Sequence, residues 1–194
     1  MRLASVYPID PVAGVIITSC FALLFGAAGV HKVRDLRQFA EVFAAYDVLP
    51  GWLSRPMSRI VPGLEVLLAS GLLIPVARER ASLAGSLLLA IYAAAIAVNL
   101  RRGRRELDCG CMGFGRSRSI SPGLVWRNAV LALALLTAGW LPWSSRPLNW
   151  LDVLTIVGGV CAGALLYVAM DGLLEFSRRL PRPPTFARDD GAGA

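Results

Sequence analysis

Five apolar segments, each close to the length of chain that crosses a lipid bilayer, limit what this sequence can fold into. They span residues 12–30, 60–77, 82–100, 124–141 and 150–170. A helix needs about 20 predominantly apolar residues to cross the hydrocarbon core. Only 17% of the side chains are charged, against about 25% in soluble domains. The sequence therefore predicts an all-α membrane protein in which residues 1–177 form a single helical domain.

The basic residues predict how these helices are oriented. If the N-terminus is outside, sixteen of the twenty Lys and Arg residues lie inside, in segments 31–59, 101–127 and 178–194. Because cytoplasmic loops are enriched in Lys and Arg, we expect a multi-pass protein of the bacterial inner (cytoplasmic) membrane with its C-terminus inside. The net charge of +7 then reflects topology, and no nucleic-acid partner is expected. The polar, Pro- and Gly-rich tail, 178–194, is expected to be disordered.

The segment after the first span has its own pattern. Apolar residues recur at helical spacing over 36–44, which indicates an amphipathic helix. The segment is too short and too charged to span, so we expect it to lie on the inner membrane surface. Just before it, Lys32 ends the first span, where a long basic side chain can extend towards the interface.

The polar segment between the third and fourth spans holds the residues best suited to chemistry. Cys109 and Cys111 lie one residue apart, with Gly110 between them. A disulfide between them requires the backbone to turn, and Gly110 permits this because glycine adopts positive φ without a steric penalty. Such a disulfide would be strained and easily exchanged. The pattern predicts transfer of a disulfide, with Cys109 and Cys111 as the reactive pair.

Basic residues surround this pair, among them Arg104 and Arg105. Positive charge stabilises the thiolate, which is the reactive form of cysteine, whereas the adjacent Asp108 opposes it. No metal site is expected, because tetrahedral zinc needs three or four protein ligands and only the two cysteines and the distant His31 are available. Inert packing of the cysteines is the remaining alternative.

Three polar side chains lie in or at the ends of the predicted spans. Glu65 is either a functional carboxylate that faces protein or water, or a shallow residue paired with Arg55 or Arg59. Asn99 and Asn128 fall at the inner ends of their helices. There they would either hydrogen-bond the backbone of the dithiol segment, since unsatisfied polar groups are costly near lipid, or be solvated at the interface.

The other two cysteines, Cys20 and Cys161, lie inside apolar spans. A free cysteine packs as a small hydrophobic residue, so core packing is the first interpretation and an electron relay across the membrane is the second. Gly159 and Gly163 flank Cys161 at the spacing of a motif that packs membrane helices.

Several motifs in a fixed order carry a resemblance to a known family. They are Gly29-x-x-Lys32, Leu49-Pro50, Pro62-x-x-Glu65, Asn99-x-x-x-Gly103, Cys109-Gly110-Cys111-Met112-Gly113 and Arg127-Asn128. Over residues 14–140 the chain resembles the MauE family, relatives of the DoxX membrane proteins. The resemblance implies a DoxX-like four-helix transmembrane bundle, to which this chain adds a fifth transmembrane helix and the interfacial amphipathic helix.

The resemblance also implies a function and site residues. Members are implicated in maturing methylamine dehydrogenase, a periplasmic enzyme rich in disulfides, with a thioredoxin-like partner. Cys109 and Cys111 match the CxC of the family, and Glu65, Asn99 and Asn128 match its recurring polar positions.

The leading hypothesis is therefore a thiol–disulfide redox protein, which would exchange electrons with a thioredoxin-like partner while another protein matures. The alternative is a non-catalytic assembly factor, or an accessory subunit of a larger membrane complex. A third interpretation is a quinone-linked thiol oxidase with a quinone pocket lined by Trp126 and Phe114. The basic residues place the CxC on the cytoplasmic side, where thiols are kept reduced. The protein would then serve a cytoplasmic thiol system, or pass electrons across the membrane through Cys20 or Cys161, unless its orientation is the opposite one.

Overall fold

The computed structural model describes residues 9–104, 106, 107 and 120–179. Helices account for most of this part of the chain: α1 Pro11–Arg34, α2 Leu36–Ala45, α3 Gly51–Leu73, α4 Arg78–Arg101, α5 Pro122–Trp140 and α6 Trp150–Arg179. All of them except α2 are long and apolar enough to cross a membrane. The expected class, an all-α, multi-pass membrane protein, is confirmed. The expected disordered tail lies mostly outside the described residues.

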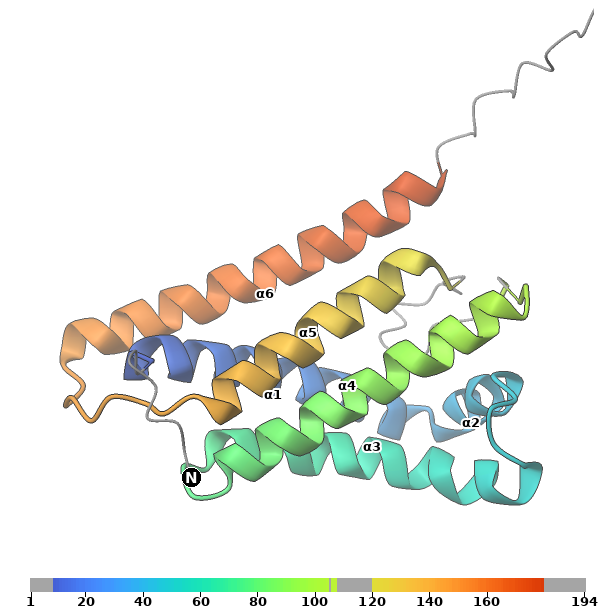
Figure 1. Cartoon of the computed structure of the whole chain (residues 1–194), viewed down its shortest axis with the longest axis horizontal. Helices are drawn as coiled ribbons and strands as arrows, with labels where there is room; N and C mark the ends of the chain where they lie inside the picture. The colour runs from blue at the N-terminus through green and yellow to red at the C-terminus, as the bar shows by residue number, and fades with distance from the viewer. Residues whose placement is uncertain (1–8, 105, 108–119, 180–194) are drawn as a thin grey trace, which may run out of the picture.

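Four of the long helices form the bundle, and α6 lies along its side (Figure 1). Helices α1, α3, α4 and α5 bury a core around Phe25, Leu72 and Leu135, each almost fully enclosed. Their outer faces carry exposed leucines such as Leu67 and Leu133. Apolar side chains on the outside of a bundle suit lipid as the surrounding solvent.

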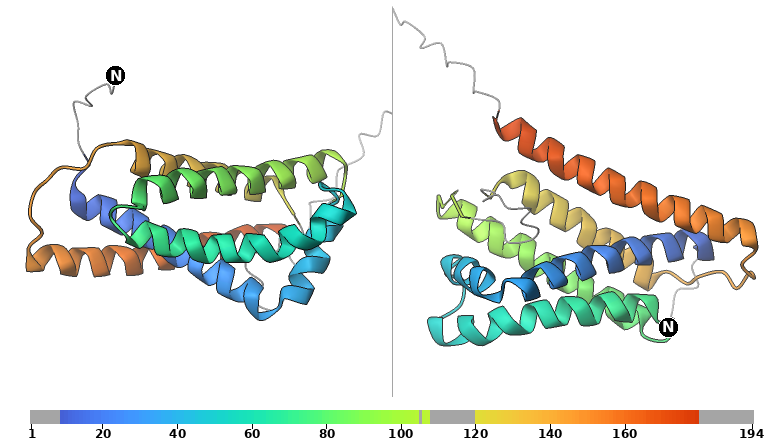
Figure 2. Two further views of the ribbon diagram at one scale, coloured as in Figure 1. Left: turned by 90° about the horizontal axis from the view of Figure 1, so that it is seen from below. Right: turned by 180° about the vertical axis from the view of Figure 1, so that it is seen from behind.

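The two ends of the bundle differ in content. One end, which we call the Asp10 end, holds the starts of α1 and α6 and the α5–α6 connection (Figure 2). A backbone pairing joins Ile9 to Pro142 and Ser144 there, and Arg146 binds both Asp10 and Asp152. The opposite end, which we call the Lys32 end, holds α2, the end of α4 and the start of α5.

The amphipathic helix α2 lies at the Lys32 end, at an angle to the spanning helices (Figures 1 and 2). Asp35 caps its first turn by accepting a hydrogen bond from the Gln38 N–H. None of its residues is buried within the chain. This position is the one expected of an interfacial helix, whose apolar side is buried by lipid rather than by protein.

Helix α3 differs from the expectation for the second span. It begins at Gly51, well before the expected start at residue 60, and it ends at Leu73, before the expected end at residue 77. Both Pro56 and Pro62 lie within it. Proline removes one backbone hydrogen bond from a helix, but membrane helices tolerate this where neighbouring groups compensate. The proline near the expected start is therefore an interior residue of α3.

Candidate functional site

The dithiol segment lies outside the described residues, as do Cys109, Gly110, Cys111 and Arg105. The structure describes the two residues from which this segment leaves the bundle. The Ile120 N–H donates a hydrogen bond to the Leu107 carbonyl oxygen at 3.0 Å. Ile120 is buried in a small cluster with Ile96 and Leu124, and Leu107 packs against it. The two ends of the segment are thus held together at the Lys32 end of the bundle.

Arg104 has a partner of its own at this end. Its guanidinium pairs with the Asp47 carboxylate at 3.3 Å, and Arg102 donates to the Asp47 backbone carbonyl at 2.9 Å. Asp47 has a positive φ of 47°, which is uncommon outside glycine and turns the chain between α2 and α3. Arg104 therefore ties the end of α4 to the α2–α3 connection. Its expected effect on a cysteine thiolate stays a prediction.

Glu65 forms a buried ion pair with Lys32. Lys32 is 3% exposed and Glu65 is 1% exposed, and the Lys32 Nζ donates to Glu65 Oε1. The Tyr92 hydroxyl donates to the same oxygen at 2.7 Å. Two expectations are corrected here. Glu65 does not pair with Arg55 or Arg59, which are exposed on α3. Lys32 does not extend to the interface, because a buried carboxylate retains it.

Close packing of α1 on α3 explains this pair. A Cβ atom at Gly29 would lie 3.1 Å from the Pro62 carbonyl oxygen and 3.2 Å from Glu65 Cβ. The missing side chain lets the two backbones approach closely, as small residues do in membrane helices. Lys32 follows Gly29 by one helical turn, and helical side chains point back towards the N-terminus. The Lys32 ammonium therefore reaches the level of Glu65.

A second ion pair, between Arg127 and Asp171, lies near the Lys32–Glu65 pair. Arg127 on α5 is buried, and its Nη1 lies 2.6 Å from Asp171 Oδ1 on α6. The Arg127 guanidinium also lies over the Tyr167 ring, 5.6 Å from its centroid. The Lys32 ammonium lies in the same way against Phe39 and Tyr92, at 5.1 and 5.0 Å. Cation–π contacts of this kind strengthen when they are desolvated.

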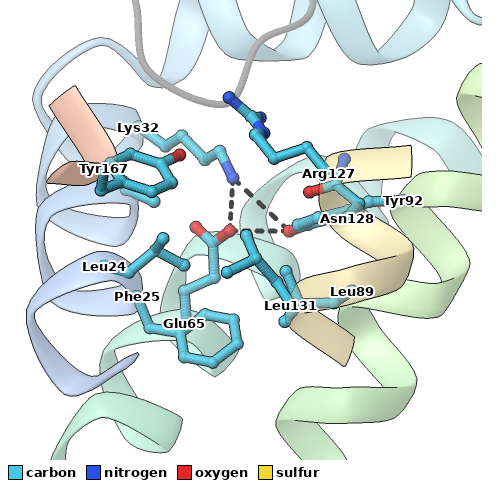
Figure 3. Close-up of a pocket in the computed structure, with 11 residues that line it drawn as sticks. Leu24, Phe25, Lys32, Glu65, Leu89, Tyr92, Arg127, Asn128, Leu131 and Tyr167 are labelled. Carbon is cyan, nitrogen blue, oxygen red and sulfur yellow. Dashed lines mark hydrogen bonds and ion pairs between the residues drawn. The ribbon is translucent and has the colours of Figure 1, made fainter. Parts of the chain in front are cut away.

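Together these groups line one small pocket to which all five long helices contribute (Figure 3). Its lining side chains are Leu24, Phe25, Ala28, Lys32, Glu65, Leu89, Tyr92, Arg127, Asn128, Leu131 and Tyr167. Charged residues inside a membrane bundle are costly and usually mark a functional site. We therefore take the pocket around Glu65 as the candidate functional site of the described chain.

Asn99 and Asn128 are both buried, but they differ in their hydrogen bonds. Asn128 lines the pocket, and its Nδ2 has no hydrogen-bond partner among the described residues. The Asn99 Nδ2 donates to the carbonyl oxygens of Tyr46 and Ala95, at 3.0 and 3.1 Å. Asn99 therefore holds the C-terminal end of α2 against α4. A bond from either asparagine to the dithiol segment stays a prediction.

The two remaining cysteines lie apart from the pocket. Cys20 is half-buried on α1, where a Cβ atom at Gly163 would lie 2.8 Å from its Sγ. A Cβ atom at Gly159 would lie 2.6 Å from Ile16. The glycine pair of α6 thus packs against α1, and Cys161, which lies between these glycines in sequence, is exposed on another face of α6. The proposed relay stays a prediction, and neither cysteine lines the Glu65 pocket.

The residues that sequence reasoning missed are Lys32, Tyr92, Arg127 and Tyr167. A signal was present for Lys32, because Gly29-x-x-Lys32 and Pro62-x-x-Glu65 place opposite charges at the same end of two apolar helices. Tyr92 and Tyr167 had no such signal, since a tyrosine in an apolar run is also an ordinary interface residue. Trp126 was expected to line a quinone pocket, but it is 73% exposed and does not line this one. Phe114 lies outside the described residues.

Comparison with known proteins places this geometry in a family. Residues 10–144 match the family model described as methylamine utilisation protein MauE. The chain is 39% identical over 132 residues to the methylamine utilization protein MauE of Methylorubrum extorquens, covering 68% of this chain and 71% of that protein. It is 38% identical over 160 residues to the methylamine utilization protein MauE of Paracoccus versutus, covering 82% of this chain and 84% of that protein.

A third relative, the MauE of Methylophilus methylotrophus, is 33% identical over 168 residues, with 86% of this chain and 88% of that protein covered. No solved structure matches the chain. The matched region includes both halves of the Lys32–Glu65 pair and the Arg127-Asn128 motif. The family model covers well over half of the chain, and the relatives cover most of it. The chain therefore belongs to the MauE family of methylamine utilisation proteins.

Proposed function

We propose that this protein is a membrane thiol–disulfide redox protein that acts in the maturation of a protein required for methylamine utilisation. Cys109 and Cys111 carry the exchange. The observation that supports this most is the hydrogen bond between Leu107 and Ile120. It closes the base of the segment that holds the two cysteines, at the end of the bundle where Lys32 and Arg127 are buried.

The chemistry is a dithiol–disulfide exchange with a thioredoxin-like partner. The thiolate of one cysteine attacks the disulfide of the partner, which forms a mixed disulfide and releases one partner thiolate. The second cysteine then attacks the mixed disulfide. The products are a Cys109–Cys111 disulfide and a reduced partner, so two electrons pass to the partner. The reverse sequence oxidises the partner.

Further residues have supporting roles in this proposal. Arg105 favours the thiolate by its charge, and Arg104 holds the end of α4 through Asp47. Gly110 allows the turn between the cysteines. Asn99, Asn128 and Glu65 maintain the polar interior of the Lys32 end. Cys20 and Cys161 are the only other thiols and would be needed for any transfer through the membrane.

The orientation is part of the proposal. The Lys32 end carries most of the basic residues, so we place it at the cytoplasmic face, with the N-terminus outside. The dithiol then meets a cytoplasmic thiol system unless electrons cross the membrane. We treat residues 1–177 as one domain, since α1, α3, α4 and α5 share one core and α6 packs against α1.

Thiol labelling with a membrane-impermeant mass tag tests both parts of the proposal. In a Cys20→Ser/Cys161→Ser background only the dithiol can react. Labelling of reduced cells only after permeabilisation supports the cytoplasmic position, and labelling from outside overturns it. A redox role predicts that the tagged fraction depends on prior reduction. Thiols that stay free and unexchanged under every condition would overturn that role.

A second experiment separates chemistry from assembly. Cys109→Ser and Cys111→Ser should each trap or abolish exchange, with loss of client maturation, while the protein still enters its membrane complexes. Cys20→Ser/Cys161→Ser is the matched control and should retain maturation if no relay exists. If the cysteine variants support normal maturation, the protein acts as an assembly factor or accessory subunit, and the exchange mechanism is wrong.

A further inference from the structure

The two oxygens of the Glu65 carboxylate have different surroundings. Oε1 accepts hydrogen bonds from Lys32 and Tyr92. Oε2 is equally enclosed but has no hydrogen-bond partner among the described residues. Leaving a buried acceptor unsatisfied costs free energy, more so for a charged group. Buried polar atoms of this kind are normally completed by a protein group, an ordered water or a ligand.

The unsatisfied oxygen belongs to a residue that lines the pocket. In Figure 3, Oε2 turns away from Lys32 and Tyr92, towards the side on which Leu24 and Tyr167 lie. Both of these residues line the same pocket as Glu65. We propose that this pocket is a binding site for a hydroxyl group, which donates its hydrogen bond to Glu65 Oε2. The proposal does not depend on the thiol chemistry.

Charge favours a neutral donor over a cation. The Lys32 ammonium already compensates the Glu65 carboxylate, and Asp171 compensates Arg127. A second ammonium group would lie against Lys32 and Arg127, and it would lose its hydration without gaining a free countercharge. A hydroxyl group needs no countercharge, and it donates the single hydrogen bond that Oε2 lacks.

Size and position allow two sources for the hydroxyl group. The pocket has room for a water molecule without any movement of its walls. The other source is the head group of a quinol dissolved in the bilayer, which carries a hydroxyl on an aromatic ring. It would have to displace the wall formed by α6, a helix with no buried residue in its apolar window. Tyr167 is the α6 residue that lines the pocket.

The test is an experimental structure of the full chain in lipid nanodiscs, at a resolution that shows ordered water, determined with and without decylubiquinol. Density for a water within hydrogen-bond distance of Glu65 Oε2 in both samples assigns the site to water. Density for the quinol ring in the second sample, with its hydroxyl on Oε2, assigns it to the quinol. The proposal is wrong if neither sample shows density within hydrogen-bond distance of Glu65 Oε2, or if Oε2 accepts a hydrogen bond from a protein group such as the Tyr167 hydroxyl.

A matched pair of variants makes the assignment independent of density alone. Ala28→Leu fills the pocket from α1 without removing a polar group, whereas Ala22→Leu adds the same side chain to the core outside the pocket. Both alanines are 6% exposed, so the two changes strain α1 to a similar extent. Bound water density, or saturable binding of decylubiquinol, should be lost in Ala28→Leu and kept in Ala22→Leu. Equal behaviour of the two variants would contradict the site.

Discussion

Lys32 and Glu65 form an ion pair that is enclosed between α1 and α3, although 33 positions separate them in sequence. Both side chains are almost fully buried within the protein, and Tyr92 on α4 completes the pair. The pair therefore joins three helices at one point. Its energetic role differs from that of a surface pair, because each charge depends on the other for compensation.

Removing one member of this pair should destabilise the protein strongly. Lys32→Met leaves the Glu65 carboxylate buried without a countercharge, at a cost of about 3–5 kcal/mol. The double variant Lys32→Met/Glu65→Met should be more stable than either single variant, because no charge is then left buried. The unfolding temperatures of the wild type and the three variants in nanodiscs measure these differences in stability.

The matched control is Arg37→Met, which breaks the exposed pair of Arg37 and Glu41 on α2. Exposed pairs contribute little, so this variant should unfold close to the wild type. If Lys32→Met behaves like Arg37→Met, the Lys32–Glu65 pair does not stabilise the fold more than an exposed pair does.

A side chain at Gly29 should separate α1 from α3. Gly29→Val would bring its Cβ to 2.9 Å from Val66 Cγ2 and 3.1 Å from the Pro62 carbonyl oxygen, so the backbone of α3 would have to move away from α1. We expect a lower unfolding temperature and a broken Lys32–Glu65 pair. Gly63→Val is the control, since nothing lies within 4 Å of its Cβ position. Equal loss of stability in both variants would show that helix propensity, and not packing, is responsible.

The attachment of α6 can be tested in the same way. Gly159→Val places its Cβ 2.6 Å from Ile16 on α1, whereas Gly158, its neighbour, has open space. Gly159→Val should loosen α6, and Gly158→Val should not. Cross-linking between cysteines introduced on α1 and α6, in a background without the native cysteines, reports the change. Unchanged cross-linking in Gly159→Val would mean that this glycine does not determine how α6 packs.

Acid should weaken the Asp10 end of the molecule. Hydrogen bonds from Arg146, and one from the Val12 N–H, hold the pKa of Asp10 below its usual value of 3.8. A carboxyl whose pKa is lower in the folded state stabilises the fold fully above the unfolded pKa. This stabilisation is lost as the pH falls through the folded value.

The unfolding temperature should therefore fall on acidification through 3.8, and it should fall less steeply in Asp10→Asn. Arg146→Gln should have a similar effect, because it removes the partner of Asp10. Identical pH profiles for the wild type and Asp10→Asn would contradict this assignment.

Several features were accessible from sequence because they depend on segment length and local composition. The apolar runs predicted the long helices, and the helical spacing over 36–44 predicted α2. The start of α3 was missed because the apolar run begins at residue 60, and a proline near the start of such a run is typical of a helix start. Here Pro62 lies mid-helix, where its carbonyl oxygen faces Gly29.

In the candidate site, too, some residues could be identified from the sequence and others could not. Glu65 and Asn128 were identified because a polar residue in an apolar run is itself a local signal. Lys32 was assigned to the interface, since basic residues at the end of a span usually lie there. The error arose because the partner of Lys32 lies on another helix, and helix proximity is not encoded in local pattern.

The sequence by itself determined the membrane class, the number of long helices, the interfacial helix and the MauE resemblance, because apolar length, helical spacing and motif order are properties of one chain segment at a time. Only the tertiary structure decided which charges compensate each other. A glycine on α1 allows close approach to α3, and this approach encloses Lys32 with Glu65 while α6 supplies Asp171 to Arg127. Compensation of buried charge is a relation between helices, so it becomes visible only when they are packed together.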